Sequence, residues 1–177
     1  MADTYLDVVN EQDEVIGQAL RSEIHAKGLW HREVGVYFVT PDKQAIFQIR
    51  GAAVDRNPNK ASATAGGHVE LGMSYEEAAL AEMFEETGVQ ANITDLEFVY
   101  SEISNRAEGG YINRAHRKVF LYNYKGPVEN LKIEDNYGAG FITCPIEKLL
   151  NQDEDVDMRL KRYTDPRFHP IYLKCML

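Results

Sequence analysis

The sequence predicts an α+β fold in a single domain that spans residues 1–177. Strand-like and helix-like segments follow one another without the regular alternation that builds a parallel sheet, which favours this class. We find no internal repeat, low-complexity tract or linker that separates two domains, and 177 residues can bury a core of their own. Hydrophobic residues at 44% and charged residues at 27% are typical of a soluble globular protein.

The first part of the chain predicts two pairs of strands. Each pair is indicated by apolar or alternating segments on either side of a short polar turn. A short helical segment lies between the pairs and ends at Gly28, a residue that suits a helix end. The expected ranges are 4–9 and 14–20 for the first pair, 22–27 for the helical segment, 34–39 and 44–50 for the second pair, and 51–60 for a polar surface loop.

A helix is predicted between Ser74 and Gly88. The Ser74 hydroxyl can cap the first turn while Glu77, three residues later, reaches back to form a capping box. Gly88 suits the left-handed conformation with which many helices end. Later segments predict strands over 96–103, 118–124 and 140–143, a helix from Pro145 to about 152, and a last helix over 166–177.

The composition excludes several classes of protein. The N-terminus lacks the pattern of a signal peptide, and no segment approaches the roughly 18 apolar residues that span a bilayer. Cys144 and Cys175 have no metal-ligand spacing, so we expect no disulfide framework and a cytoplasmic location. A net charge of −9 argues against nucleic-acid binding, which needs basic residues to neutralise phosphates. We therefore expect neither a nucleic-acid nor a membrane partner.

The predicted helix carries a row of glutamates. Glu82, Glu85 and Glu86 stand at i, i+3 and i+4, so they project from one face, while apolar residues form a separate core face. Such carboxylates repel one another, and Mg²⁺ or Mn²⁺, which prefers oxygen ligands, removes that cost. Gly66 and Gly67 let the backbone pass close to a ligand. Three carboxylates alone also suit a solvated helix face, so only the longer pattern favours a metal site.

That longer pattern resembles the Nudix box. Seven residues match it in register: Gly67, Glu82, Met83, Glu85, Glu86, Gly88 and Val89. The resemblance implies a Nudix fold, with a mixed central β-sheet sandwiched between helices, and a hydrolase that acts on diphosphate bonds with Mg²⁺ or Mn²⁺. It also implies that the metal ligands are Glu82, Glu85, Glu86 and the carbonyl of Gly66, and that Glu82 and Glu86 are catalytic.

Two positions depart from the Nudix box. Met73 stands where the family has its first glutamate, and Ala81 stands where it has an arginine that orients the next glutamate. Losing such outer support typically lowers metal affinity or activity by about 10–100-fold. The three later glutamates are retained, so we expect an enzyme whose activity these two substitutions weaken.

Segments outside the box are similar to the branch of the family that contains isopentenyl-diphosphate isomerase and its hydrolase relatives. The similar stretches are 7–11, 15–17, 21–23 and 28–32. Gly66 stands where isomerases have a catalytic cysteine, and their two later glutamates, expected around 113–115, are missing, so we reject isomerase activity. His31 and His68 match metal-binding histidines of isomerases, and His25 lies near a third. Because the rest of that site is broken, we interpret His31 as a structural histidine.

Some assignments stay open at this point. Ala115 replaces a glutamate that hydrolase relatives often carry, and the carboxylates that could serve instead are Glu102, Glu108, Glu134 and Asp135. Arg50, at a strand end, suits either a substrate phosphate or an exposed position.

The leading hypothesis is a Mg²⁺-dependent hydrolase of a small nucleoside-diphosphate-linked or related diphosphate substrate. The alternative is a degenerate Nudix domain that binds a phosphorylated ligand or partner with little or no turnover, and Met73, Ala81 and Ala115 support it. The sequence leaves open whether the protein forms a homodimer.

Overall fold

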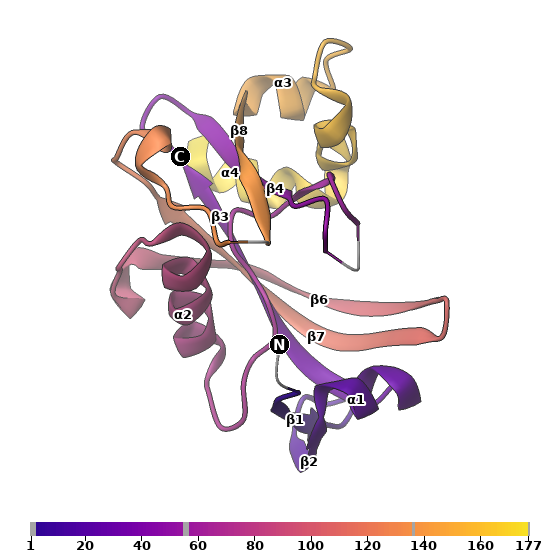
Figure 1. Cartoon of the computed structure of the whole chain (residues 1–177). Coiled ribbons are helices and arrows are strands. Elements are labelled where there is room, and N and C mark those ends of the chain that lie inside the picture. Colours follow the sequence, from indigo (N-terminus) through magenta and orange to yellow (C-terminus); the bar gives the residue numbers. More distant parts are fainter. Residues whose placement is uncertain (1–2, 55–56, 136, 177) are drawn as a thin grey trace.

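The strands form two sheets (Figure 1). The structure is a computed structural model that describes residues 3–54, 57–135 and 137–176. In the small sheet, β1 (Tyr5–Val9) pairs with β2 (Val15–Leu20). The large sheet has the order β5-β4-β3-β7-β6, with β8 paired to β4. Its strands are β3 (Trp30–Val39), β4 (Gln44–Arg50), β5 (Ala61–Ser62), β6 (Leu96–Glu108), β7 (Tyr111–Asn123) and β8 (Gly138–Pro145).

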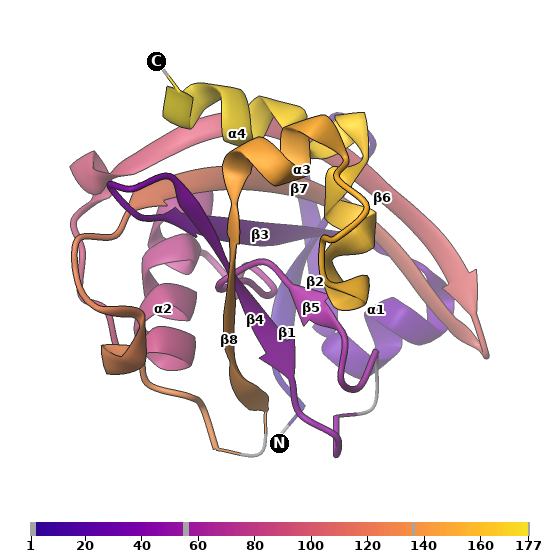
Figure 2. The ribbon, with the colours of Figure 1, turned by 90° about the horizontal axis from the view of Figure 1, so that it is seen from above.

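Helices cover both faces of the large sheet, which is mixed because β3 and β7 run parallel while its other pairs are antiparallel. Figure 2 shows α2 on one side of β4 and β8, and α3 and α4 on another. The α-helices are α1 (Arg21–Lys27), α2 (Tyr75–Thr87), α3 (Ile146–Asn151) and α4 (His169–Met176). Short 3₁₀ helices are Ile93–Asp95, Val128–Asn130, η3 (Met158–Thr164) and η4 (Pro166–Phe168). This arrangement confirms the predicted α+β class and the predicted mixed sheet between helices.

Helix α2 has the predicted ends and the predicted core face. Ser74 and Glu77 form both halves of a capping box, in which the Ser74 N–H donates to Glu77 Oε2 over 2.8 Å. Gly88 ends the helix at φ 71°, a left-handed conformation that glycine adopts without strain. Ala79 and Met83 are fully buried against the sheet. The buried face orients α2, so that Glu86 lies at its edge with 4% exposure, Glu82 is half-buried and Glu85 is exposed.

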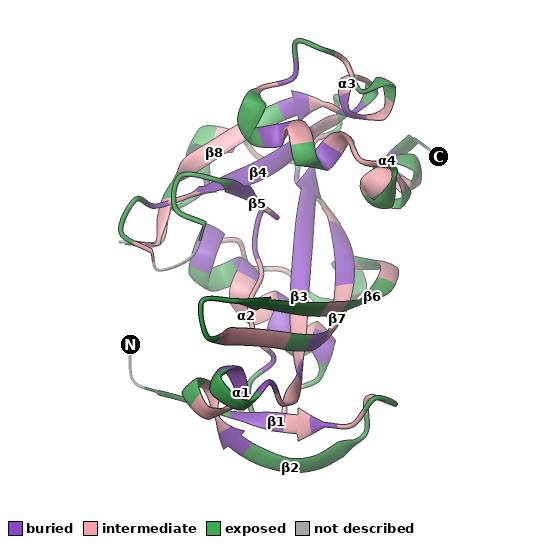
Figure 3. Ribbon diagram, turned by 90° about the vertical axis from the view of Figure 1, so that its right-hand side faces the viewer, coloured by how far each residue is buried: buried purple, intermediate pink, exposed green. Residues whose placement is uncertain are grey.

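The hairpin of β6 and β7 is longer than predicted. The expected strands covered 96–103 and 118–124, whereas pairing continues to the turn at Gly109 and Gly110, whose φ angles are 56° and 81°. Figure 3 shows β6 largely exposed, whereas β3, on the other side of β7, is largely buried. Polar residues in the outer part of the hairpin give no hydrophobic pattern, although their backbones pair as well as those of buried strands.

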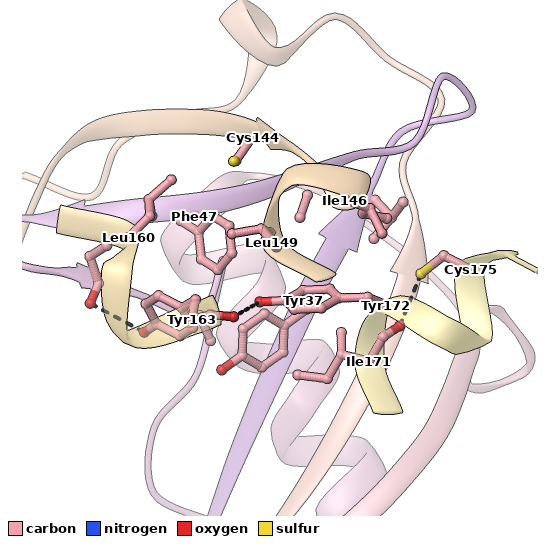
Figure 4. Packing of buried hydrophobic residues seen from close by; sticks show 14 of the residues in the cluster. Tyr37, Phe47, Cys144, Ile146, Leu149, Leu160, Tyr163, Ile171, Tyr172 and Cys175 are labelled. Carbon is pink, nitrogen blue, oxygen red and sulfur yellow. Dashed lines mark hydrogen bonds between the residues drawn. The ribbon is translucent and has the colours of Figure 1, made fainter. Parts of the chain in front are cut away.

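The C-terminal segment differs from the single predicted helix over 166–177. It begins as η4 and continues as α4, and Leu177 lies outside the described residues. The preceding η3 was not predicted. Tyrosine hydrogen bonds connect this region to the core (Figure 4). The Tyr172 hydroxyl donates to the carbonyl of Tyr163 over 2.9 Å. Tyr163 in turn donates to the carbonyl of Ala61 in β5 over 3.2 Å.

Two expectations from composition can be compared with the structure. Among the helices of the described residues, none combines the length and apolar character needed to cross a membrane. Cys144 and Cys175 are buried and unbridged, as expected from the absence of a disulfide framework.

Candidate active site

The glycine loop runs beside β3 and turns one peptide group toward α2. The N–H and carbonyl of Ala65 pair with Val36, and the carbonyl of Gly67 accepts from Val34 over 2.9 Å. Because neighbouring groups of an extended backbone point in opposite directions, the N–H and carbonyl of Gly66 face away from β3. The Gly66 N–H accordingly donates to Glu86 Oε2 over 3.1 Å. The Gly66 carbonyl thus lies on the side of the loop that faces the glutamates.

Both glycines are required by close approach. A Cβ atom at Gly66 would lie 2.6 Å from the backbone oxygen of Val34, so the loop could not pack on β3. A Cβ atom at Gly67 would lie 2.0 Å from Glu82 Oε1, in the space that this carboxylate occupies. The loop therefore packs closely on β3 at Gly66, and the absence of a side chain at Gly67 leaves the space in which the Glu82 carboxylate reaches the loop.

A cavity of about 320 Å³ lies between the loop and α2, and we call it the carboxylate cavity. It brings together the three glutamates predicted from the sequence and two that the Nudix pattern did not indicate. The carboxylates that line it are Glu70, Glu82, Glu85, Glu86 and Glu134. Arg21, at the start of α1, lines the same cavity.

The carboxylate cavity disfavours the charged forms of Glu82, Glu86 and Glu134. Burial, followed by the charges of Glu85 and Glu134, raises the pKa of Glu82 from 4.5 to about 7. Arg21 lowers that pKa in part. Burial and the charge of Glu82 raise the pKa of Glu86 well above its ordinary value, against the effect of the Gly66 N–H. Burial and the charge of Glu85 also raise the pKa of Glu134. A bound cation would relieve this repulsion, and clustered carboxylate oxygens are the donors that Mg²⁺ and Mn²⁺ prefer.

The two departures from the Nudix box have different surroundings. Met73 packs against the hydrophobic cluster beneath α2, so its position contributes to the core rather than to the carboxylate cavity. Ala81 is half-buried. Arg21 is the basic residue that acts on Glu82 here, and it comes from a helix far away in the sequence. Sequence reasoning missed Arg21 because only the folded chain brings it to Glu82.

A second cavity, of about 280 Å³, adjoins the first, and we call it the arginine cavity. Gly66, Gly67, Glu86 and Arg21 line both cavities. The arginines in the lining of the second cavity are Arg21, Arg50, Arg106, Arg117, Arg162 and Arg167.

Arg50 lies in the arginine cavity at the end of β4. Its Nη1 donates to the Tyr137 hydroxyl over 3.5 Å, and its guanidinium lies 4.9 Å from the centre of that ring. Of the two positions considered for Arg50, the structure thus places it in a cavity lining, half-buried beside Glu86.

The four carboxylates considered as replacements for the missing glutamate separate into three groups. Glu134 lines the carboxylate cavity, whereas Glu102 lines the arginine cavity, 3.6 Å from Arg117. Within the described residues, Glu108 and Asp135 take part in the lining of neither cavity. Glu134 is therefore the member of this set that lies with the glutamates of α2.

Three histidines from separate elements meet next to the glycine loop. The nitrogens of His25, His31 and His68 that could bind a metal all lie within 4.8 Å of one another. Burial lowers the pKa of His25 to about 4 and that of His68 to about 3, so both are neutral near pH 7, which is the metal-binding form. This arrangement can hold a transition metal ion through nitrogen ligands.

His31 shows features of both a structural and a ligand histidine. Its Nδ1 lies 3.2 Å from the carbonyl of Leu29, as a structural histidine would. Its buried Nε2 has no hydrogen-bond partner within the described residues and lies 3.6 Å from Glu33 Oε1. Ala115, paired with His31 on β7, is fully buried and adds no ligand. The interpretation of His31 as purely structural is therefore incomplete.

Known proteins resemble this chain over most of its length. A family model described as the NUDIX domain matches residues 29–164. An uncharacterized Nudix hydrolase of Clostridium acetobutylicum is 27% identical over 152 residues, which cover 84% of this chain and 73% of that protein. One of Rhodococcus erythropolis is 31% identical over 137 residues, covering 72% and 71%. The chain spans about half the length of some other relatives, such as 48% of one from Streptomyces coelicolor that is 41% identical over 87 residues.

Solved structures agree with the fold. A Deinococcus radiodurans protein superimposes with a TM-score of 0.65 at 23% identity, covering 84% of this chain and 87% of that one. The NUDIX domain of a Shewanella oneidensis protein, solved with ADP-ribose, superimposes with a TM-score of 0.51 at 14% identity, covering 69% and 77%. The family model, the relatives and the shared fold lead to one conclusion: the chain belongs to the Nudix hydrolase family.

Proposed function

We propose that this protein is a Mg²⁺- or Mn²⁺-dependent hydrolase that cleaves the diphosphate linkage of a small nucleoside-diphosphate-linked or related substrate. The observation that carries this proposal is the meeting of the carboxylate cavity and the arginine cavity at Gly66, Gly67 and Glu86. A diphosphate at this junction lies between groups that hold divalent cations and groups that bind phosphate directly. The ADP-ribose complex of the Shewanella oneidensis domain supports a substrate of this class.

The metal ligands in this proposal are Glu82, Glu85, Glu86 and the carbonyl of Gly66. All three glutamates line one cavity, and the Gly66 peptide faces them. When bound, the metal neutralises phosphate charge and lowers the pKa of a water molecule. The Nudix pattern and the oxygen-only donor set both support this assignment, and Glu134 adds a further carboxylate to the same cavity.

Proton transfer is assigned to the same face of α2. The Gly66 N–H holds Glu86 Oε2, which orients the carboxylate and leaves Oε1 as the candidate acceptor of the proton from the attacking water. Glu82 is the second catalytic candidate, because it lines the same cavity as Glu86 and its carboxylate reaches the glycine loop. Arg50 is assigned to a substrate phosphate, since it lines the adjoining cavity beside Glu86.

Hydrolysis is favoured over isomerisation of a prenyl diphosphate. Gly66 stands where an isomerase needs a cysteine, and packing against Val34 leaves no room for any side chain there. Cys144 and Cys175 lie in the hydrophobic cluster on the other side of the sheet, outside the lining of either cavity. The chain thus offers water rather than a thiol as the reacting partner.

The proposal is tested by incubating the protein with Mg²⁺ and a panel of dinucleotides, nucleotide sugars, nucleoside polyphosphates and prenyl diphosphates, and measuring phosphate or monophosphate release. We expect release from the nucleoside compounds and its loss in Glu86→Gln. The matched control is Glu154→Gln, an exposed position near the C-terminal segment that should retain activity. Binding without release across the whole panel would instead favour a degenerate domain that holds a phosphorylated ligand.

A further inference from the structure

We propose that the substrate carries at least one phosphate beyond the diphosphate that is cleaved, and that the arginine cavity binds it. The proposal rests on the proposed function, because it specifies the substrate of that same site. Its ligand is defined by chemistry: a third or fourth phosphoryl group, either in a linear polyphosphate or as a separate phosphate on the departing half of the molecule.

The basic residues in the lining of the arginine cavity are arginines rather than lysines. The chain has a net charge of −9, yet six arginines of its described residues line this one cavity. The described residues of the lining include none of its nine lysines and only three acids, Glu33, Glu86 and Glu102. Arginine differs from lysine in presenting a planar fork that binds two phosphate oxygens at once. A general need for positive charge would not discriminate between the two residue types, whereas phosphate recognition does.

The backbone of β3 leaves space for the Arg117 side chain at Gly35. A Cβ atom at Gly35 would lie 2.5 Å from Arg117 Nη2, so the bare backbone of β3 accommodates the guanidinium. The nearest paired carboxylate is Glu102 at 3.6 Å, which is longer than a strong charge-assisted hydrogen bond. Arg117 Nε is buried and lacks a hydrogen-bond partner within the described residues. Arg117 is thus a half-buried cation, with 27% of its side chain exposed, whose hydrogen-bonding capacity is not used up by the described residues.

Arg162 and Arg167 line the arginine cavity from the C-terminal segment. Tyr163 lies between them in the chain, is 3% exposed, and is hydrogen-bonded to Ala61 and Tyr172 (Figure 4). The Arg162 guanidinium lies over the Tyr163 ring, 5.2 Å from the ring centre. The buried tyrosine therefore positions the exposed Arg162 guanidinium at the edge of the cavity, and Arg167, which pairs with Asp165, lines the same cavity.

The position of the arginine cavity determines which part of a substrate it contacts. It shares Gly66, Gly67 and Glu86 with the carboxylate cavity, so a diphosphate at this junction extends directly into the arginines. A neutral sugar or a prenyl chain against the half-buried Arg117 would desolvate its guanidinium without supplying a negative charge, which is costly. An additional phosphate supplies that charge instead. The diphosphate bond is hydrolysed at the carboxylate cavity, and the arginine cavity determines which substrate is bound.

The test compares two variants of arginines that have matched surroundings. In Arg162→Gln/Arg167→Gln both altered positions are exposed and line the cavity. In Arg159→Gln the altered arginine is exposed on the same segment and pairs with Asp157, as Arg167 pairs with Asp165, but it is outside the lining. Circular dichroism and thermal unfolding establish that each variant is folded.

The first measurement is calorimetric titration of inorganic tripolyphosphate into wild type and variants, with EDTA present so that turnover plays no part. We expect the double variant to bind at least about tenfold more weakly, as the loss of charge-assisted contacts implies, and Arg159→Gln to bind as wild type does. Equal affinities in all three proteins would overturn the proposal.

The second measurement is kcat/KM with Mg²⁺ for dinucleoside diphosphates against dinucleoside tetraphosphates, and for a dinucleotide with and without a separate ribose phosphate. We expect a preference of about tenfold or more for the compound with extra phosphate in one of these pairs, lost in the double variant. The pair that shows it identifies the source of the phosphate. Turnover without any such preference would refute the inference while leaving hydrolysis intact. Arginine-dependent tripolyphosphate binding without turnover would refute hydrolysis and leave the arginine site intact.

Discussion

Glu82 should destabilise the protein when no metal is present. Its pKa rises from 4.5 to about 7 on folding, because of burial and the neighbouring Glu85 and Glu134. A group with a raised folded-state pKa contributes stability below its unfolded pKa and loses it as the pH rises through the folded value. At about 1.4 kcal/mol per pKa unit, and allowing for partial exposure, the loss between pH 4.5 and 8 is about 2–3 kcal/mol.

Glu82→Gln removes this pH-dependent loss. In EDTA at pH 8, urea denaturation should give the variant a free energy of unfolding about 2–3 kcal/mol higher than that of wild type, with little difference at pH 5. With Mg²⁺ at about 1,000 times its Kd the order should reverse, because a ligand at that concentration stabilises by about 4.1 kcal/mol only the protein that binds it. Glu154→Gln, an exposed control, should follow wild type throughout. Equal stabilisation of wild type and Glu82→Gln by Mg²⁺, or no gain for the variant in EDTA, would refute the reasoning.

Three further substitutions test the loop, the missing arginine and the cap. Gly67→Ala should lower Mn²⁺ affinity by tenfold or more in calorimetry, since its Cβ would displace Glu82. Gly17→Ala, with open space around its Cβ, should leave the affinity unchanged. Equal affinities in the two variants would contradict the close packing of the glycine loop on Glu82. Ala81→Arg should raise kcat/KM by up to about tenfold, by orienting Glu82; an unchanged value would mean that Glu82 is already positioned. Ser74→Ala should cost about 1 kcal/mol in urea denaturation, and a neutral result would contradict the role of the capping box.

The parts of the fold that follow from local chemistry were predictable. The capping box at Ser74, the left-handed Gly88 and the buried face of α2 are properties of consecutive residues, and the structure confirms each. The outer half of the β6–β7 hairpin was missed because exposed strands lack a hydrophobic pattern. The segment η3 was missed because its place depends on hydrogen bonds from Tyr163 and Tyr172, which no local pattern indicates.

The candidate site likewise has one part that the sequence predicts and other parts that only the fold brings together. The three glutamates of α2 lie within five positions of one another, so the sequence alone placed them on one face. The histidine cluster joins α1, β3 and the glycine loop, and the arginine cavity joins both ends of the chain to its middle. Only tertiary packing creates such sites. A gathering of arginines in an acidic protein gives no local sequence pattern when its members are spread from position 21 to position 167.

The central claim is that water attacks phosphorus at the carboxylate cavity. Hydrolysis of a dinucleoside tetraphosphate in water enriched with ¹⁸O, with Mg²⁺ present, tests it directly when the products are examined by ³¹P NMR. The account predicts ¹⁸O on one product phosphate for wild type and no turnover for Glu86→Gln. Turnover that leaves every phosphate free of ¹⁸O, or that continues at the wild-type rate in Glu86→Gln, would contradict it.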